Sequence, residues 1–112
     1  MVHLLNTAIL PSGCDGRWQV APLSLEAARD LIAEACWTSH IGHDSTAALA
    51  SALLGIKVSM SREPWDGTGR AVVVQLAFRG EEGRVYSSEE MAAFHAEGKV
   101  VLRLSEWLDQ PR

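Results

Sequence analysis

Apolar residues along the chain form short runs and helix-spaced stripes, which predict strands alternating with helices. Residues 2–5 form an apolar run that predicts a buried strand, and residues 17–21 alternate in polarity, which indicates a short exposed strand. The longest apolar stretch, residues 70–78, is typical of a central strand covered on both faces. An edge strand over residues 56–60 and a last strand over residues 99–104 complete a predicted sheet of about five strands.

Three helices are expected between these strands. Ser24 is predicted to cap the first, whose apolar residues recur at spacings of three and four up to Cys36. The second is predicted over residues 46–54, with Gly55 as the residue that ends it. The third opens with a capping box over residues 87–90. The order β-β-α-α-β-β-α-β predicts an α/β fold, in which helices flank a mixed β-sheet.

Composition indicates one soluble, globular domain. The 112 residues are 47% hydrophobic and 21% charged, and they provide for a single core, so we expect one domain over residues 1–112. No apolar run approaches the roughly 18–20 residues that span a bilayer, and the start of the chain has no signal-like segment. We therefore expect no membrane partner and a cytoplasmic location, which would be the host cytoplasm if the gene is viral.

The charge balance bears on the possible partners. Ten Lys and Arg stand against 14 Asp and Glu, which gives a formal net charge of −4. This balance argues against general binding to duplex DNA or RNA, because such proteins carry a basic face. A small phosphorylated ligand remains compatible, since it needs only a few local cations and backbone amides.

Neither the cysteines nor most of the histidines indicate a site. Cys14 and Cys36 lie 22 positions apart, and we expect both to be reduced thiols. His3, His40 and His95 are expected to be structural. Because no His and Cys pairs stand at ligand spacing, the sequence predicts no metal and no cofactor.

The most informative segment is Ile-Gly-His-Asp-Ser-Thr, residues 41–46. Asp44 or Ser45 is expected to cap the helix that follows, and free amides at a helix N-terminus are a natural site for a phosphate. Gly42 permits close approach of the backbone, and the imidazole of His43 titrates near neutral pH. By spacing alone, a surface or helix-packing role for His43 is the stronger interpretation.

A second candidate lies where the predicted central strand ends. Residues 75–83 run from the strand into a loop with flanking glycines, and they present Gln75, Arg79 and Glu82 together. A strand end of this kind fits either a ligand site or an ordinary solvated turn. Arg62, after the expected edge strand, fits a surface charge as well as a ligand contact.

Taken in order, these segments resemble the viral anti-CRISPR ring nucleases, a family with archaeal-virus, phage and cellular members. The resemblance rests on the apolar strand that ends in Asn6, the motif at residues 41–46, Arg62, and the block at residues 75–83. It extends from residue 2 to about residue 104. The motif and the strand-end block are fairly specific together, whereas either alone is weak.

The resemblance implies a homodimer whose two-fold interface binds cyclic tetra-adenylate, the messenger of type III CRISPR defence. It implies metal-independent cleavage to linear di-adenylate with 2′,3′-cyclic phosphate ends, which switches the signal off. His43 and Glu82 match the catalytic residues: His43 as general acid, and Glu82 either orienting His43 or approaching the 2′-OH. Ile9 stands where some relatives have a hydroxyl residue, so that contact is unassigned. The implied substrate-binding residues are Asn6, Gly42, Asp44, Ser45, Thr46, Arg62, Gln75 and Arg79.

Two other functions remain open at this point. A binding-only sponge would sequester cyclic oligoadenylate without cleaving it, and the presence of both His43 and Glu82 argues against this. A small DNA-binding regulatory protein is the other alternative, and the net charge of −4 argues against it.

Overall fold

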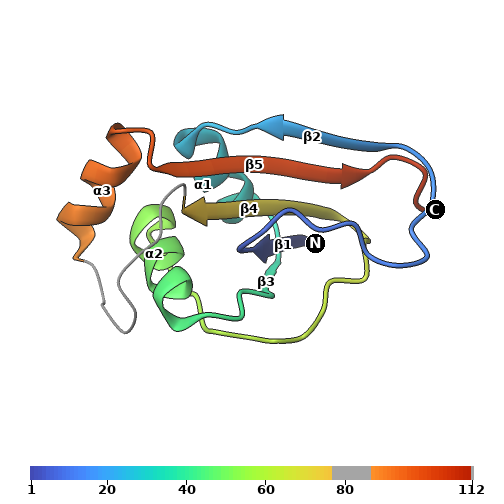
Figure 1. Ribbon diagram of the computed structural model, residues 1–112, viewed down its shortest axis with the longest axis horizontal. Helices are drawn as coiled ribbons and strands as arrows, with labels where there is room; N and C mark the ends of the chain where they lie inside the picture. Colours follow the sequence, from blue (N-terminus) through green and yellow to red (C-terminus); the bar gives the residue numbers. More distant parts are fainter. Residues whose placement is uncertain (77–86, 112) are drawn as a thin grey trace.

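The computed structural model describes residues 1–76 and 87–111, which form one α/β domain (Figure 1). Its five-stranded sheet has the order β2-β5-β4-β1-β3. β1 runs parallel to β3 and to β4, whereas β5 is antiparallel to both β4 and β2, so the sheet is mixed as expected. The strands are β1 (Val2–Leu5), β2 (Trp18–Pro22), β3 (Trp37–Ser39), β4 (Arg70–Leu76) and β5 (Val100–Trp107).

Three helices cover one face of this sheet: α1 (Leu25–Glu34), α2 (Asp44–Leu54) and α3 (Ser88–Ala96). Side chains alternate between the two faces of a strand, so every second strand residue faces the helices. The core that results contains Leu4, Val72 and Leu102 from the strands and Ile32, Leu49 and Met91 from the helices.

Three predicted helix ends are confirmed, namely the start of α1, the end of α2 and the start of α3, because each depends on local chemistry. The Ser24 side chain accepts a hydrogen bond of 3.1 Å from the Ala27 amide at the start of α1. Gly55 takes a left-handed conformation with φ of 71°, and its amide donates to the Ser51 carbonyl at the end of α2. The capping box at residues 87–90 opens α3.

The prediction of an edge strand over residues 56–60 is wrong, because the edge strand is β3 instead. β3 pairs with β1 in the register Val2↔Trp37, and the Val2 amide donates to the Cys36 carbonyl at 2.8 Å. The 56–60 segment is held elsewhere, because the buried Val58 donates its amide to the Ser51 hydroxyl at 2.8 Å. Both segments are short and partly apolar, so local polarity did not distinguish them.

Three other boundaries also differ from expectation. α2 begins at Asp44, two residues before the predicted start, and α1 ends at Glu34 rather than reaching Cys36. β5 continues to Trp107, past the expected end at Leu104, because it pairs with β2 as far as Trp18↔Trp107.

The second face of the sheet is covered differently from the first. Its small cluster contains Leu5, Trp65, Ala71 and Val73, with Trp18 packed against it. Trp65 comes from the loop between α2 and β4, yet it is only 2% exposed. Its ring meets the Trp18 ring edge to face, with centroids 5.7 Å apart. A loop tryptophan therefore helps to bury the central strands on the side away from the helices.

A buried histidine lies beside this cluster. His3 of β1 is 8% exposed, and its Nδ1 lies 2.8 Å from Nε2 of His40, which follows β3. Nδ1 of His40 lies 2.7 Å from the Glu63 carbonyl oxygen. Burial and the neighbouring His40 lower the pKa of His3, although Asp66 acts in the opposite direction.

We predict that Gly69→Ala destabilises the fold more than Gly98→Ala does. Both glycines have left-handed φ values, 71° and 75°, which cost a non-glycine residue about 1–2 kcal/mol. At Gly69 an added Cβ would also collide with the Met1 carbonyl oxygen, whereas at Gly98 no described atom lies within 4 Å. Overpacking should add about 1–3 kcal/mol to the first loss. Urea unfolding of both variants measures this difference, and equal losses would show that the β1–β4 approach is not tightly packed.

We also predict that the protein loses stability as the pH falls. Because the folded-state pKa of His3 lies below its unfolded value of about 6.5, the unfolded chain binds more protons below that pH. The free energy of unfolding should therefore decrease as the pH drops through about 6.5 towards the folded-state pKa. His3→Phe should reduce this slope and His95→Phe, the same exchange on α3, should not. Denaturant unfolding over a pH series measures the slope, and an unchanged slope in His3→Phe would contradict the assignment.

Candidate functional site

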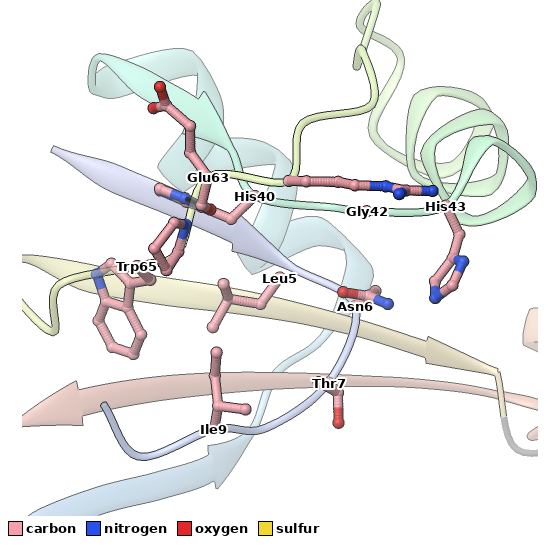
Figure 2. Close-up of a pocket in the computed structure, with 11 residues that line it drawn as sticks. Leu5, Asn6, Thr7, Ile9, His40, Gly42, His43, Glu63 and Trp65 are labelled. Carbon is pink, nitrogen blue, oxygen red and sulfur yellow. Dashed lines mark hydrogen bonds between the residues drawn. The ribbon is translucent and has the colours of Figure 1, made fainter. Parts of the chain in front are cut away.

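A cleft of about 500 Å³ opens at the carboxyl end of β1 (Figure 2). β1 and β3 are parallel, so the segments that follow them emerge at the same edge of the sheet, where ligand sites of α/β proteins commonly form. A third segment, residues 62–65, forms the opposite wall, which we call the cleft rim. The lining residues are Leu5, Asn6, Thr7, Ile9, His40, Gly42, His43, Arg62, Glu63, Pro64 and Trp65.

The start of α2 borders this cleft and differs from the prediction. The residue at the N-cap position is His43, with φ of −130° and ψ of 131°, and no described side chain caps the helix. Asp44 and Ser45 are therefore inside the first turn rather than at the cap. The amides of that turn donate to no side-chain cap. They lie at the positive end of the helix dipole and follow directly after His43, which lines the cleft. The His43 side chain is exposed and projects into the cleft together with Asn6 (Figure 2).

Arg62 lies across the backbone of Gly42. A Cβ added at Gly42 would be 3.6 Å from Cγ of Arg62, which is ordinary van der Waals contact. Arg62 is exposed, and no residue in the ranges 1–76 and 87–111 forms an ion pair with it. Its guanidinium can therefore bind an incoming anion without first giving up a carboxylate partner.

The cleft thus combines a cation, an exposed imidazole and an apolar wall. Arg62 and the first-turn amides of α2 favour phosphate oxygens. The exposed imidazole of His43 can donate a proton to a ligand or accept one. The exposed Ile9 side chain provides apolar surface against which a flat, aromatic group can pack, whereas Leu5 and Trp65 border the cleft with almost no exposed surface. This combination fits a ligand that carries both phosphates and bases.

The structure brings together part of the predicted site. Asn6, Gly42, His43 and Arg62 all line the cleft, although they come from three segments of the chain. Gln75 lies on β4 opposite Val101 of β5 and does not line it.

The other predicted residues lie beside the cleft or outside the residues that the structure describes. Asp44 is exposed, Ser45 half-buried and Thr46 buried in the first turn of α2, next to the cleft. Arg79 and Glu82 lie outside the described residues.

Seven residues of the cleft were not predicted as ligand contacts, namely Leu5, Thr7, Ile9, His40, Glu63, Pro64 and Trp65. His40 was expected to be structural, because β3 was not predicted. Knowing that β3 lies parallel to β1 would have placed His40, which follows β3, at the same sheet edge as Asn6. Ile9 was left unassigned, although it follows Asn6 closely in the chain. Glu63 and Trp65 carry no local signal, because they reach the cleft only through the course of the loop before β4.

The described part of the chain contains neither a metal-ligand cluster nor a helix that could span a membrane. Within residues 1–76 and 87–111, no three His, Cys, Asp or Glu side chains come together in a way that could hold a metal ion. No helix of the same ranges is long and apolar enough to cross a bilayer. Cys14 and Cys36 are free thiols.

The chain is similar to two proteins of archaeal viruses. The chain is 28% identical over 94 residues to "Uncharacterized protein 26" of Sulfolobus islandicus filamentous virus (isolate Iceland/Hveragerdi), and the match covers 80% of each chain. The solved structure of B116 of Sulfolobus turreted icosahedral virus shares its fold with a TM-score of 0.75 at 22% identity. That match covers 94% of this chain and 97% of B116.

A family model described as STIV B116-like matches residues 2–98, a range that contains β1, the α2 start and the whole cleft. Because the match takes in nearly the whole chain, this protein belongs to the STIV B116-like family.

Proposed function

We propose that this protein is a metal-independent ring nuclease that binds cyclic tetra-adenylate and cleaves it to linear di-adenylate. The observation that carries the proposal is the joining of Asn6, His43 and Arg62 in one cleft at an uncapped helix N-terminus. These are the residues at which the sequence resembles the viral anti-CRISPR ring nucleases, and they lie far apart in the chain.

Ring binding would depend mainly on the phosphates. We expect the first-turn amides of α2 to share one phosphate with Arg62, because these amides follow directly after Gly42 and His43 and the Arg62 side chain lies beside Gly42. Such local recognition is compatible with the net charge of −4, because a small ligand contacts only a few groups. Gln75 and Arg79 are further proposed contacts from the β4 side.

The chemistry would use the ligand's own nucleophile. A ribose 2′-oxygen attacks the adjacent phosphorus, the bond from phosphorus to the 5′-oxygen breaks, and a 2′,3′-cyclic phosphate forms. Holding these atoms in line contributes several kcal/mol, on the order of 7–11 in favourable cases. Protonated His43 donates its proton to the departing 5′-oxygen. Glu82 would either orient His43 or accept the proton of the 2′-OH.

The proposal includes a homodimer. One chain offers an open cleft of about 500 Å³, which can contact a four-nucleotide ring on one side only. A second copy related by a two-fold axis would supply the same groups to the opposite phosphate, which matches the symmetry of the ring. Two cuts, one in each half, convert the ring into two linear di-adenylates.

The biological role follows from the substrate. Cyclic tetra-adenylate activates the ancillary nucleases of type III CRISPR systems, so its destruction would switch the response off. The relatives found in Sulfolobus viruses support an anti-CRISPR role, exerted in the cytoplasm of the host.

We predict that His43→Ala abolishes cleavage without abolishing binding. Loss of the general acid should lower the single-turnover rate by about 10²–10⁴-fold, while the phosphate contacts remain. Radiolabelled cyclic tetra-adenylate is incubated in EDTA with the wild type, His43→Ala and His95→Ala, the last as a control on α3. An unchanged rate in His43→Ala would disprove the assignment. Tight binding by the wild type without any product would identify a sponge.

We predict that Arg62→Gln weakens ring binding and reduces its dependence on salt. A charge-assisted hydrogen bond contributes about 1.5–3 kcal/mol, which corresponds to a dissociation constant raised by about tenfold to a hundredfold. Titrations at several salt concentrations, in the His43→Ala background so that the ring survives, measure both effects. Arg70→Gln is the matched control, because Arg70 pairs with Val2 at the opposite end of β1. Equal losses in the two variants would show that Arg62 contributes only general charge.

A further inference from the structure

Two hydrogen bonds connect the buried sheet to the cleft rim. His3 Nδ1 lies 2.8 Å from His40 Nε2, and His40 Nδ1 lies 2.7 Å from the Glu63 carbonyl oxygen. A carbonyl oxygen only accepts, so Nδ1 of His40 carries a hydrogen and donates it. The chain of contacts therefore runs from β1 through two imidazoles to the backbone of the rim.

Few hydrogen bonds tie residues 62–65 to the rest of the described chain, although Trp65 packs in the core and the neighbouring Ser61 and Asp66 are bonded to Ile41 and Cys14. Within residues 1–76 and 87–111, His40 is the hydrogen-bond partner that reaches the rim from outside its own loop, since Glu63 and Trp65 otherwise bond to Ser61 and Thr68. The buried Trp65 ring packs 5.8 Å from the His3 ring, centroid to centroid. Both members of the pair thus contact the segment that carries Arg62.

The geometry limits the protons that the pair can hold. When both imidazoles are neutral, His3 donates through Nδ1 to Nε2 of His40, and both contacts are satisfied. One added proton is also accommodated, because His40 can then donate from both nitrogens while His3 accepts. With two added protons, two N–H groups would face each other across 2.8 Å, so the contact between His3 and His40 must break.

We propose that His3 and His40 are positioning residues that hold the cleft rim, and with it Arg62, in the arrangement that binds the ring. The pair accepts one proton with its geometry intact, and the second proton breaks the contact between His3 and His40 that connects the rim to β1. The identity of the ligand rests on the proposed function. The coupling of the His3–His40 pair to the rim rests only on the two contacts described above.

The charged groups around the pair act in different directions. The chain's amino terminus and His40 both disfavour a proton on His3, as does burial, and the carboxylate of Asp66 favours it. Burial is the largest of these and lowers the pKa of His3. On the cleft side, His43, Arg62 and the side chain of Glu63 are near His40. Because a proton on His40 disfavours a proton on His3, the second proton enters at a lower pH than the first.

The first arm of the test uses no ligand. Nuclear magnetic resonance follows the imidazole signals of His3 and His40 and the Glu63 and Trp65 amides between about pH 8 and pH 5. We expect two separated protonation steps, with the rim amides shifting at the second. In His3→Phe the contact with His40 is absent at every pH, so the rim amides should show no shift at a second protonation step. Independent titration of the two histidines, with no movement of the rim, would overturn the proposal.

The second arm measures binding of cyclic tetra-adenylate by His43→Ala over the same pH range. The dissociation constant should rise by about fivefold or more as the second proton enters, which corresponds to the loss of about one hydrogen bond. With His3→Phe added, binding should not weaken in acid, and with His95→Phe added, the wild-type pH dependence should remain. Identical pH profiles with and without His3 would overturn the positioning role. If the ring binds at no pH while the rim still follows the pair, the proposed function fails and the coupling stands.

Discussion

The burial of β1 between two parallel neighbours is the constraint on which the rest of this molecule depends. All four of its residues are buried, and it pairs with β3 on one side and β4 on the other. A strand covered on both faces and both edges cannot slip by one residue without exposing its apolar side chains. Its carboxyl end is therefore fixed, and Asn6, the first residue beyond it, opens into the cleft at a defined place.

The second face of the sheet connects stability to the candidate site. No described helix covers this face, and Trp65 takes part of that role from a loop. The same residue lines the cleft, and the residues before it carry Arg62. The rim is thus part of the core as well as part of the site, which explains why a long loop without regular structure keeps a defined course. Substitutions that loosen this face should affect ligand binding and folding together.

Much of the candidate site could be anticipated because it follows short sequence signals. Gly42 and His43 belong to a motif directly before a helix, and Asn6 ends an apolar strand. Their meeting in one cleft also requires that β1 and β3 be parallel neighbours, and the sequence did not indicate β3. His40 was therefore expected to be structural, although it lines the cleft and contacts both His3 and the rim. The true cap position of α2 was missed for a related reason, because Asp44 and Ser45 are good caps by residue type and the fold begins the helix at Asp44.

The sequence by itself determined the elements whose energetics are local. Ser24, Gly55 and the capping box at residues 87–90 define helix ends through hydrogen bonds to atoms a few positions away, and these were predicted. The tertiary structure decided which short segment became the edge strand, since β3 and residues 56–60 have similar local preferences. It also decided that Trp65 would be buried and that Glu63 would meet His40. These outcomes depend on contacts between distant parts of the chain, whose energies arise only when the sheet has formed.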